Sequence, residues 1–140
     1  MINLLEHCLK KIDLSPYSRG NRNKGTELLT SSIENFACEQ KYECEKEVFL
    51  GLRRKTDGHK GLTDIIIRRP DGIRYAIEID SSNKKWSLEK LLYAYRIGYV
   101  PIWVRWCSKI KINISTVINL IDLTTSHPKT LRSRMTIQPS

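Results

Sequence analysis

Two apolar runs, each interrupted by acidic residues, constrain the fold of this chain more than any other feature. They cover residues 62–69 and 73–80, and Pro70, Asp71 and Gly72 lie between them. Proline fixes φ at the first turn position and glycine accepts a left-handed conformation, so the sequence predicts a β-hairpin. In an antiparallel hairpin the start of one strand lies opposite the end of its partner. The acidic residues of both runs are therefore expected at one end of the sheet.

The acidic residues in question are Asp64 in the first run and Glu78 and Asp80 in the second. Side chains alternate along a strand, so Glu78 and Asp80 should project from the same face. Carboxylates gathered beside a hydrophobic sheet are unfavourable unless a cation joins them. The hairpin therefore predicts a divalent metal site formed by Asp64, Glu78 and Asp80.

The length and charge of the chain indicate one basic domain. At 140 residues it is long enough for one hydrophobic core, which we place at residues 1–123, followed by a flexible basic tail at 124–140. The formal net charge is +9, and the cations occur in clusters. Such an excess favours a polyanionic partner, most often nucleic acid, although solubility alone is the alternative explanation.

The four cysteines have no CxxC spacing and are interpreted as free thiols in a reducing compartment. The sequence contains no signal peptide and no apolar run of membrane-spanning length, which predicts a cytoplasmic protein without a membrane partner.

Hydrophobic periodicity predicts a small α/β domain with a mixed sheet. Helices are expected over residues 2–12, 26–40 and 84–97, strands over 42–52 and 99–106, and a short helix or strand over 114–123. Ser81, Ser82 and Asn83 offer capping side chains for the third helix, and Gly98 is placed to end it. Since that helix connects two strands, the strands should be parallel.

The faces of two elements follow from the same patterns. Along the strand at 42–52, Cys44, Val48 and Leu50 are expected on one side, and the three glutamates at 43, 45 and 47 on the other, as a solvated face. The inward positions of the helix at 84–97 are predicted to be Leu88, Leu91, Leu92 and Tyr95.

A basic, glycine-containing loop at 53–61 leads directly into Asp64, which makes it a candidate for contacts with a phosphate backbone. The predicted nucleic-acid-binding residues are Arg53, Arg54, Lys55, His59, Lys60 and Arg68. Trp86, Trp103 and Trp106 are further candidates for stacking on bases, although a core position is the favoured alternative for Trp103.

The acids suit the hydrolysis of a phosphodiester, which needs charge neutralisation at phosphorus and an activated water. Carboxylates that bind Mg²⁺ supply both. Because Mg²⁺ keeps several waters, two or three carboxylates are sufficient. Asp64 and Glu78, with the backbone carbonyl of Ile79, would form a reasonable set of ligands, and a nearby lysine would stabilise the developing negative charge.

With Asp64 early in the second expected strand and Glu78 fourteen residues later in the third, the chain resembles the PD-(D/E)xK nuclease superfamily, the restriction-endonuclease-like fold. The resemblance covers residues 25–106 and implies an αβββαβ core, with a mixed central sheet flanked by helices. Small members of this superfamily, such as archaeal Holliday junction resolvases and very-short-patch-repair-like endonucleases, have a comparable size. The resemblance implies DNA as the partner, Mg²⁺ as the cofactor with Mn²⁺ as a substitute, and a homodimer.

The sequence departs from the family pattern at Asp80, which occupies the position of the family's lysine. In some branches of the family this lysine has moved to the following helix, which points to Lys84 or Lys85 here, with Lys90 a poorer candidate. Family members often add a glutamate from the helix before the sheet. Glu27 is the candidate that we name, although Glu27 and Glu34 both fall on the polar side of that helix.

Two functions follow from this resemblance. The first is a metal-dependent DNA endonuclease in which Asp64, Glu78, Asp80, Lys84, Lys85 and Glu27 are the catalytic candidates. The alternative is a catalytically inactive protein of nuclease fold that acts as a nucleic-acid-binding or protein-interaction module.

Overall fold

The computed structural model describes residues 1–124 of the chain, so the tail predicted at 124–140 lies almost entirely outside the described residues. Helices and strands follow one another as α1 (Ile2–Lys10), a short 3-10 helix η1 (Ser15–Tyr17), α2 (Arg22–Glu39), β1 (Glu43–Arg53), β2 (Lys60–Arg68), β3 (Arg74–Asp80), α3 (Lys85–Arg96), β4 (Val100–Arg105) and β5 (Asn119–Asp122). The predicted elements are present, and the final segment forms a strand.

The five strands form one mixed sheet in the order β1-β2-β3-β4-β5. β1, β2 and β3 pair antiparallel, whereas β3, β4 and β5 pair parallel. The predicted hairpin and the parallel pairing across α3 are therefore confirmed. Gly98 follows α3 with φ +102, a conformation that glycine adopts without strain, and it ends the helix as predicted.

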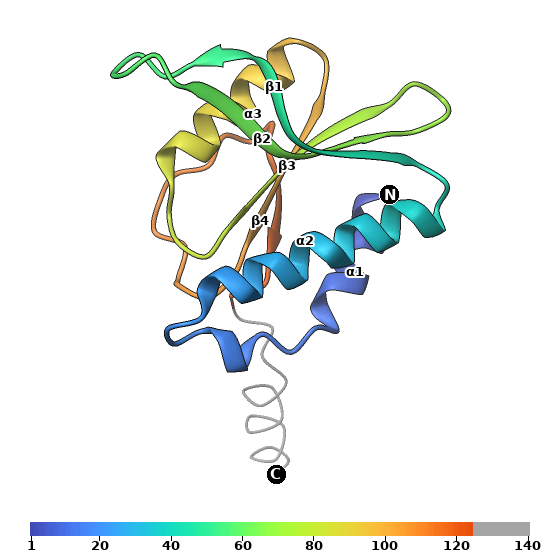
Figure 1. The fold of residues 1–140 in the computed structure, drawn as a ribbon, viewed down its shortest axis with the longest axis vertical. Helices are drawn as coiled ribbons and strands as arrows, with labels where there is room; N and C mark the ends of the chain where they lie inside the picture. The colour runs from blue at the N-terminus through green and yellow to red at the C-terminus, as the bar shows by residue number, and fades with distance from the viewer. Residues whose placement is uncertain (125–140) are drawn as a thin grey trace.

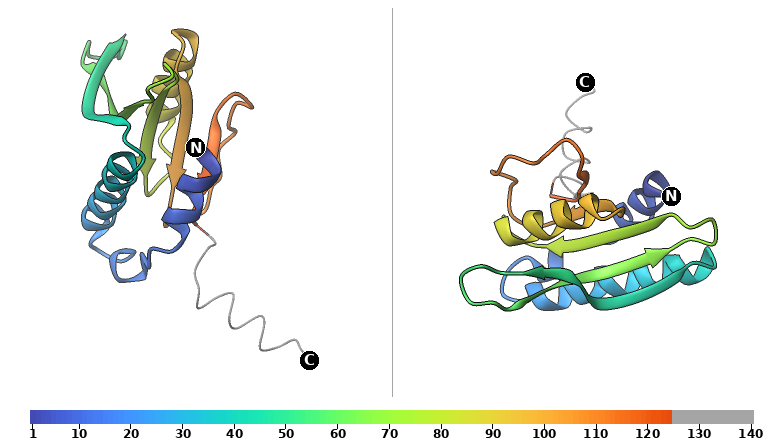
Figure 2. Two further views of the ribbon diagram at one scale, coloured as in Figure 1. Left: turned by 90° about the vertical axis from the view of Figure 1, so that its right-hand side faces the viewer. Right: turned by 90° about the horizontal axis from the view of Figure 1, so that it is seen from above.

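Helices cover both faces of the sheet (Figures 1 and 2). One core cluster unites α1 and α2 with the sheet through residues such as Leu5, Leu29, Ile33 and Ile77. The other lies between the sheet and α3, with Leu88, Leu91 and Trp103 among its buried members. The protein is thus an α/β domain with a five-stranded mixed sheet flanked by helices. Among the described residues, no helix combines the length and the apolar character needed to cross a bilayer.

Helix α2 begins at Arg22, four residues before the predicted start, because Gly25 belongs to the helix rather than to the preceding loop. A Cβ at Gly25 would overlap the indole ring of Trp106. The Nε1 atom of Trp106 also donates a hydrogen bond to Thr26 Oγ1 at 3.3 Å. Gly25 therefore allows the first turns of α2 to pack directly on the end of the sheet.

The prediction that Ser81, Ser82 or Asn83 caps α3 is wrong. Its N-cap is Lys84, and no side chain makes a capping hydrogen bond there. The Oδ1 atom of Asn83 instead accepts hydrogen bonds from Arg105 Nη2 at 3.2 Å and from the Lys111 amide at 3.4 Å. The fully buried Arg105 also donates to the carbonyls of Asp80 and Trp106. Arg105 thereby connects the end of β3 to the segment that leads into α3.

Two predicted faces are also wrong. Cys44 packs with the α1 and α2 cluster, but Val48 and Leu50 pack with the α3 cluster, so the inward face of β1 changes along the strand. The change occurs at Glu47, whose φ of +56 is left-handed and interrupts the regular alternation. On α3, Tyr95 is 49% exposed, and Ala94 takes a buried position instead.

Candidate functional site

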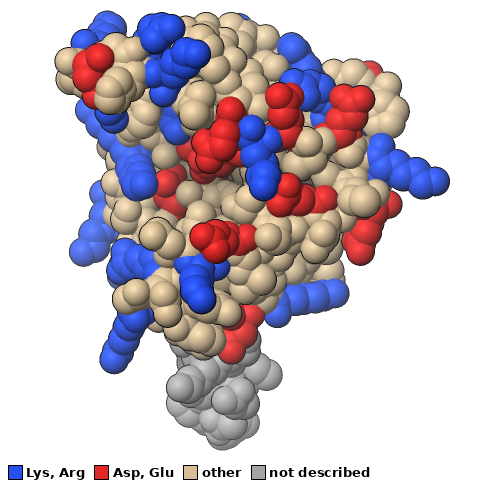
Figure 3. Space-filling view, viewed as in Figure 1, with Lys and Arg blue, Asp and Glu red and all other residues tan. Residues whose placement is uncertain are grey.

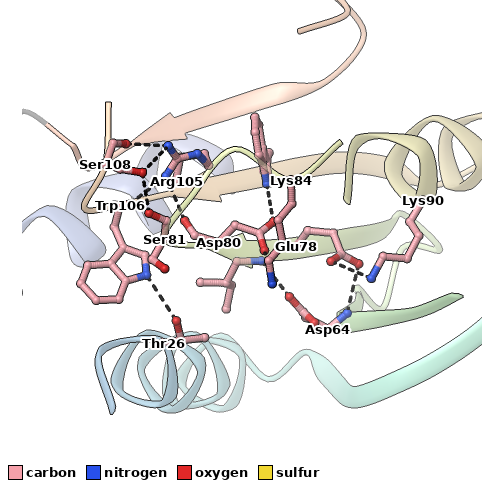
Figure 4. Close-up of polar contacts among 12 residues, drawn as sticks. Thr26, Asp64, Glu78, Asp80, Ser81, Lys84, Lys90, Arg105, Trp106 and Ser108 are labelled. Carbon is pink, nitrogen blue, oxygen red and sulfur yellow. Dashed lines mark hydrogen bonds and ion pairs between the residues drawn. The ribbon is translucent and has the colours of Figure 1, made fainter. Parts of the chain in front are cut away.

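The candidate site lies where β2 and β3 stop pairing. Their paired residues run from Arg68 and Arg74 to Ile65 and Ile77, so Asp64 and Glu78 are the first residues beyond the ladder. There each acid accepts a hydrogen bond from the other strand: the Asp64 amide donates to Glu78 Oε2 at 3.3 Å, and the Ile79 amide donates to Asp64 Oδ2 at 2.9 Å (Figure 4). The two carboxylates therefore take the place of a ladder hydrogen bond and are held beside each other.

The cation nearest to this pair comes from the middle of α3. Lys90 Nζ lies 3.1 Å from Glu78 Oε1 and donates a hydrogen bond to the Leu62 carbonyl at 2.8 Å. The Lys90 side chain is 12% exposed and that of Glu78 only 2%. A buried ammonium with two defined acceptors has a fixed position, unlike a surface lysine. Lys90, the poorer candidate from the sequence, is thus the lysine that contacts the acids.

Burial acts on both acids, and the charges of neighbouring carboxylates add to its effect. Burial raises the pKa of Asp64, and the hydrogen bond from Ile79 and the charge of Lys90 only partly oppose this effect. The pKa of Glu78 is raised well above its usual value, first by burial and then by the charge of Asp64, with Lys90 opposing. Two carboxylates that resist ionisation together gain from an added cation, which would favour their charged forms.

Asp80 faces a different set of partners, although it is also buried. Its Oδ2 atom accepts a hydrogen bond from Trp103 Nε1 at 2.8 Å, and Lys84 Nζ lies 3.8 Å from its Oδ1 atom. Lys84 therefore contacts Asp80 and not the Asp64–Glu78 pair (Figure 4). The Asp80 carboxylate is thus the acceptor of a buried hydrogen bond from Trp103.

The site opens into a cleft of about 680 Å³ between α2, the sheet and the start of α3. The cleft is lined by Asp64, Glu78 and Asp80, by Lys84 and Lys90, and by Glu27, Glu34 and Glu47 among others, but Lys85 is not part of the lining. Glu27 and Glu34 thus reach the cleft from the polar side of α2. Glu34 is engaged there with Lys46, whose Nζ atom is 3.4 Å from its Oε2 atom.

Glu47 and Lys90 are the residues of the cleft that sequence patterns undervalue. The predicted solvated face of β1 is confirmed, since Glu43, Glu45 and Glu47 are exposed, but Glu47 also lines the cleft, where its charge raises the pKa of Asp64. For Lys90 a signal exists: it lies three residues after Ser87 and four before Ala94, both buried. Small residues on one stripe indicate a helix that packs closely on the sheet.

Gly61 completes the packing around Lys90. A Cβ at this position would lie 2.8 Å from Trp86 Cζ2 and 3.3 Å from Lys90 Cδ. Trp86 in turn lies beneath two cations, with Arg54 Cζ at 5.6 Å and Lys90 Nζ at 5.9 Å from its ring centroid. The start of β2 therefore approaches α3 closely enough to hold both side chains in place.

Five of the six predicted nucleic-acid-binding residues lie together at the end of the β1–β2 hairpin, namely Arg53, Arg54, Lys55, His59 and Lys60. Asp57 organises this end: it accepts from Arg54 Nη2 at 2.6 Å and from the His59 amide at 3.0 Å. These hydrogen bonds lower the pKa of Asp57 to about 2. Arg68 lies at the opposite end of β2 and pairs with Glu45 at 3.0 Å, so it is not part of this group.

The space-filling view shows how these charges are distributed (Figure 3). Basic side chains gather over the β1–β2 hairpin at the upper left, and acidic side chains lie near the middle of the same face. A polyanion bound on this face would contact the cations and pass close to the acids.

The donor set fits a hard divalent cation of the Mg²⁺ type through Asp64 and Glu78. In residues 1–124 no group of three or more His, Cys, Asp or Glu side chains is arranged to hold a metal ion, and the Oδ2 atom of Asp80, the third predicted ligand, accepts the hydrogen bond of Trp103. Asp80 as a metal ligand stays a prediction. Mg²⁺ is nevertheless commonly bound by one or two carboxylates and retained waters. The paired acids and the adjoining cleft meet that requirement.

Comparisons with protein-family models, with curated proteins and with solved structures found no match to this chain. Any functional assignment therefore depends on the residues of the cleft themselves.

Proposed function

We propose that this protein is a metal-dependent DNA endonuclease of restriction-endonuclease-like fold, which hydrolyses phosphodiester bonds. The observation that carries the proposal is the convergence of Asp64, Glu78 and Lys90 where β2 and β3 stop pairing. The order of α2, the three antiparallel strands, α3 and β4 agrees with the αβββαβ core that the sequence resemblance implies.

Asp64 and Glu78 are the residues that would hold Mg²⁺, or Mn²⁺ in its place. The bound ion would supply Lewis acidity and a water of lowered pKa. Lys90 is positioned by Glu78 and by the Leu62 carbonyl, so its ammonium can stabilise negative charge that develops on the phosphate. In this proposal Lys90 provides the cation that Asp80 cannot provide, and Lys84 and Lys85 have no direct role.

The cations of the β1–β2 hairpin would bind the phosphate backbone and set its course toward the cleft. They lie at the end of the hairpin from which β2 leads into Asp64, and Lys60 is itself a residue of β2. Such contacts position a nucleic acid without reading its sequence.

A second candidate is a nucleic-acid-binding module without cleavage. The observation that favours it is the ion pair of Lys90 with Glu78, which already supplies a cation to the two buried carboxylates from within the chain. The two candidates share the basic surface and differ only in whether the acids perform chemistry.

The decisive experiment incubates the protein with supercoiled, linear, branched and single-stranded DNA in the presence of Mg²⁺, Mn²⁺ or EDTA. We expect cutting with the metals and none with EDTA. Asp64→Asn and Glu78→Gln should each lower the rate by about 100-fold or more, because metal-derived stabilisation amounts to several kcal/mol.

Asp71→Asn is the matched control, since it makes the same change of carboxylate to amide in the turn at the other end of β2 and β3. It should leave cutting within about twofold of the wild-type rate, as expected for a change on an exposed turn. Salt-dependent binding of DNA without any cutting would reject the endonuclease and support the module.

A further inference from the structure

The ring of Phe49 lies on the surface of the β1–β2 hairpin and is 38% exposed. Its neighbours Val48 and Leu50 pack toward α3. Because side chains alternate along a strand, Phe49 projects from the opposite face. A single exposed aromatic residue is common in proteins, and only its surroundings can give it a function.

Those surroundings are two cations. Arg53 Cζ lies 5.3 Å and Lys60 Nζ 5.1 Å from the centroid of the Phe49 ring. Arg53 and Lys60 are opposite each other in the strand register, and Arg53 Nη1 donates to the Gly58 carbonyl at 3.1 Å, which holds the guanidinium in place. Within residues 1–124, neither of these two cations forms an ion pair with a carboxylate. Both charges therefore remain available to an anion.

An aromatic ring between two available cations matches the chemistry of a nucleotide. The ring offers a face on which a base stacks, and the cations bind the adjoining phosphates. In a duplex the faces of the bases are covered by their neighbours, so that only base edges are exposed in the grooves. Stacking on Phe49 therefore requires a base that is not part of a helix.

The position of Phe49 relates this contact to the cleft. Phe49 pairs with Leu62, which lies two residues before Asp64 on β2. At about 3.3 Å per residue, this separation is about 7 Å along the strand. The Leu62 carbonyl also accepts the hydrogen bond from Lys90, so the same backbone position contacts both groups.

We propose that Phe49, Arg53 and Lys60 bind an unpaired nucleotide, and that the substrate is DNA with a single-stranded or splayed segment next to the cleavage position. This assignment of the substrate class rests on the proposed endonuclease function. The binding contact itself requires no cutting and can be measured without it.

The test measures fluorescence anisotropy with three labelled DNAs of matched sequence: a single strand, a Y-shaped splayed duplex and a blunt duplex. EDTA is present throughout, so that no DNA is cut. Phe49→Leu keeps an apolar side chain but removes the stacking face. It should weaken binding of the single strand and the splayed duplex by about 5- to 100-fold, the range expected for one base stacked on an aromatic ring.

The blunt duplex should change by less than about twofold with the same variant, since its contacts are to phosphates. The control is Tyr95→Leu, which removes an aromatic side chain that is 49% exposed on α3 and should change none of the three affinities. Phe49→Trp keeps a stacking face, so it should retain binding, and single-stranded DNA should quench its added fluorescence.

Three results would overturn the inference: unchanged single-strand binding by Phe49→Leu, an equal loss on all three DNAs, or no DNA binding by the wild-type protein. Failure of the proposed function would look different. In that case Phe49 would still discriminate single-stranded from duplex DNA in EDTA, but no metal would produce cutting.

Discussion

Both ends of the β2–β3 hairpin place acidic side chains beside a cation, but one end is exposed to water and the other is buried. At the turn, Asp71 is exposed, pairs with Arg69 Nη2 at 2.6 Å and accepts the Ile73 amide at 3.2 Å. The hydrogen bond from Ile73, followed by that from Arg69, lowers the pKa of Asp71. At the other end, burial and the charges of neighbouring carboxylates raise the pKa of Asp64 and Glu78, even with Lys90 at 3.1 Å from Glu78.

The difference shows that an ion pair alone does not define a functional site. The turn pairs its charges in water, where they fix a loop at little cost. The open end keeps two acids close together and away from water, where one cation does not satisfy both. An arrangement that is unfavourable for the empty protein is expected where a ligand, here a metal ion, completes it.

The largest expected difference between the two ends is in the rate of DNA cutting after the cation at each end is removed. Lys90→Met should lower the rate of DNA cutting by about 100-fold, because it removes the fixed positive charge that would stabilise the negative charge developing on the phosphate. Arg69→Met removes the corresponding cation at the turn and should leave the rate within about twofold. Rates are measured on supercoiled DNA with Mg²⁺, and circular dichroism establishes that both variants fold.

Lys84→Met supplies the critical comparison on α3. Lys84 is largely exposed and its ammonium lies 3.8 Å from Asp80, so its removal should cost less than about threefold in rate. A greater loss from Lys84→Met than from Lys90→Met would restore the lysine assignment made from the sequence and remove Lys90 from the site.

A smaller effect is expected in the pH dependence of stability. Because folding raises the pKa of Asp64 and Glu78, the folded protein binds more protons than the unfolded chain between the unfolded and folded pKa values. The free energy of unfolding should therefore decrease as pH rises through this interval, by at most about 1.4 kcal/mol per pH unit for each acid. Asp64→Asn and Glu78→Gln should flatten this dependence in urea unfolding followed at successive pH values.

For Asp71 the free energy of unfolding should change with pH in the opposite direction. Its lowered pKa means that its contribution is present above the unfolded pKa and is lost as pH falls through the folded pKa. Asp71→Asn should therefore reduce stability at neutral pH and have no effect at strongly acidic pH. Identical pH profiles for the variants at the two ends would show that the acids do not differ in environment.

Sequence patterns were sufficient for the hairpin and for the position of its acids. The turn at Pro70 and Gly72 and the alternation of the flanking strands are local properties, and local properties determine where Asp64 and Glu78 lie along the chain. The antiparallel pairing then brings them to one end. For the same reason the parallel pairing of β3 with β4 followed from the helix between them.

The sequence predictions that were wrong or incomplete concern features that depend on contacts between distant segments of the chain. The choice of Lys90 over Lys84 depends on where α3 crosses β2; Ser87 and Ala94 indicate the stripe of α3 that packs on the sheet but not the segment that it crosses. The start of α2 depends on Gly25 meeting Trp106, which is far away along the chain. Glu47 is exposed as predicted, but its place in the lining of the cleft depends on how β1 lies relative to α2 and α3, which the alternation of the strand does not contain.

The smallest expected effect on the rate of cutting concerns Asp80. This buried acid lies next to the site and accepts a hydrogen bond from Trp103. Asp80→Asn removes the charge but keeps an oxygen for the Trp103 Nε1 hydrogen bond at 2.8 Å. If Asp80 is structural, the rate of cutting should change by less than about threefold. Asp80→Ala would instead leave the buried indole N–H unsatisfied and lower the free energy of unfolding by about 1–3 kcal/mol.

Cutting rates and urea unfolding curves for the two Asp80 variants separate the two roles. A structural acid loses stability with alanine and little with asparagine, whereas a metal ligand loses about 100-fold in rate with either. The second outcome would place all three acids of the hairpin in one metal site, as the sequence alone suggested. The first outcome would confine the chemistry to Asp64 and Glu78, because they are the acids for which burial and repulsion are not offset within the chain.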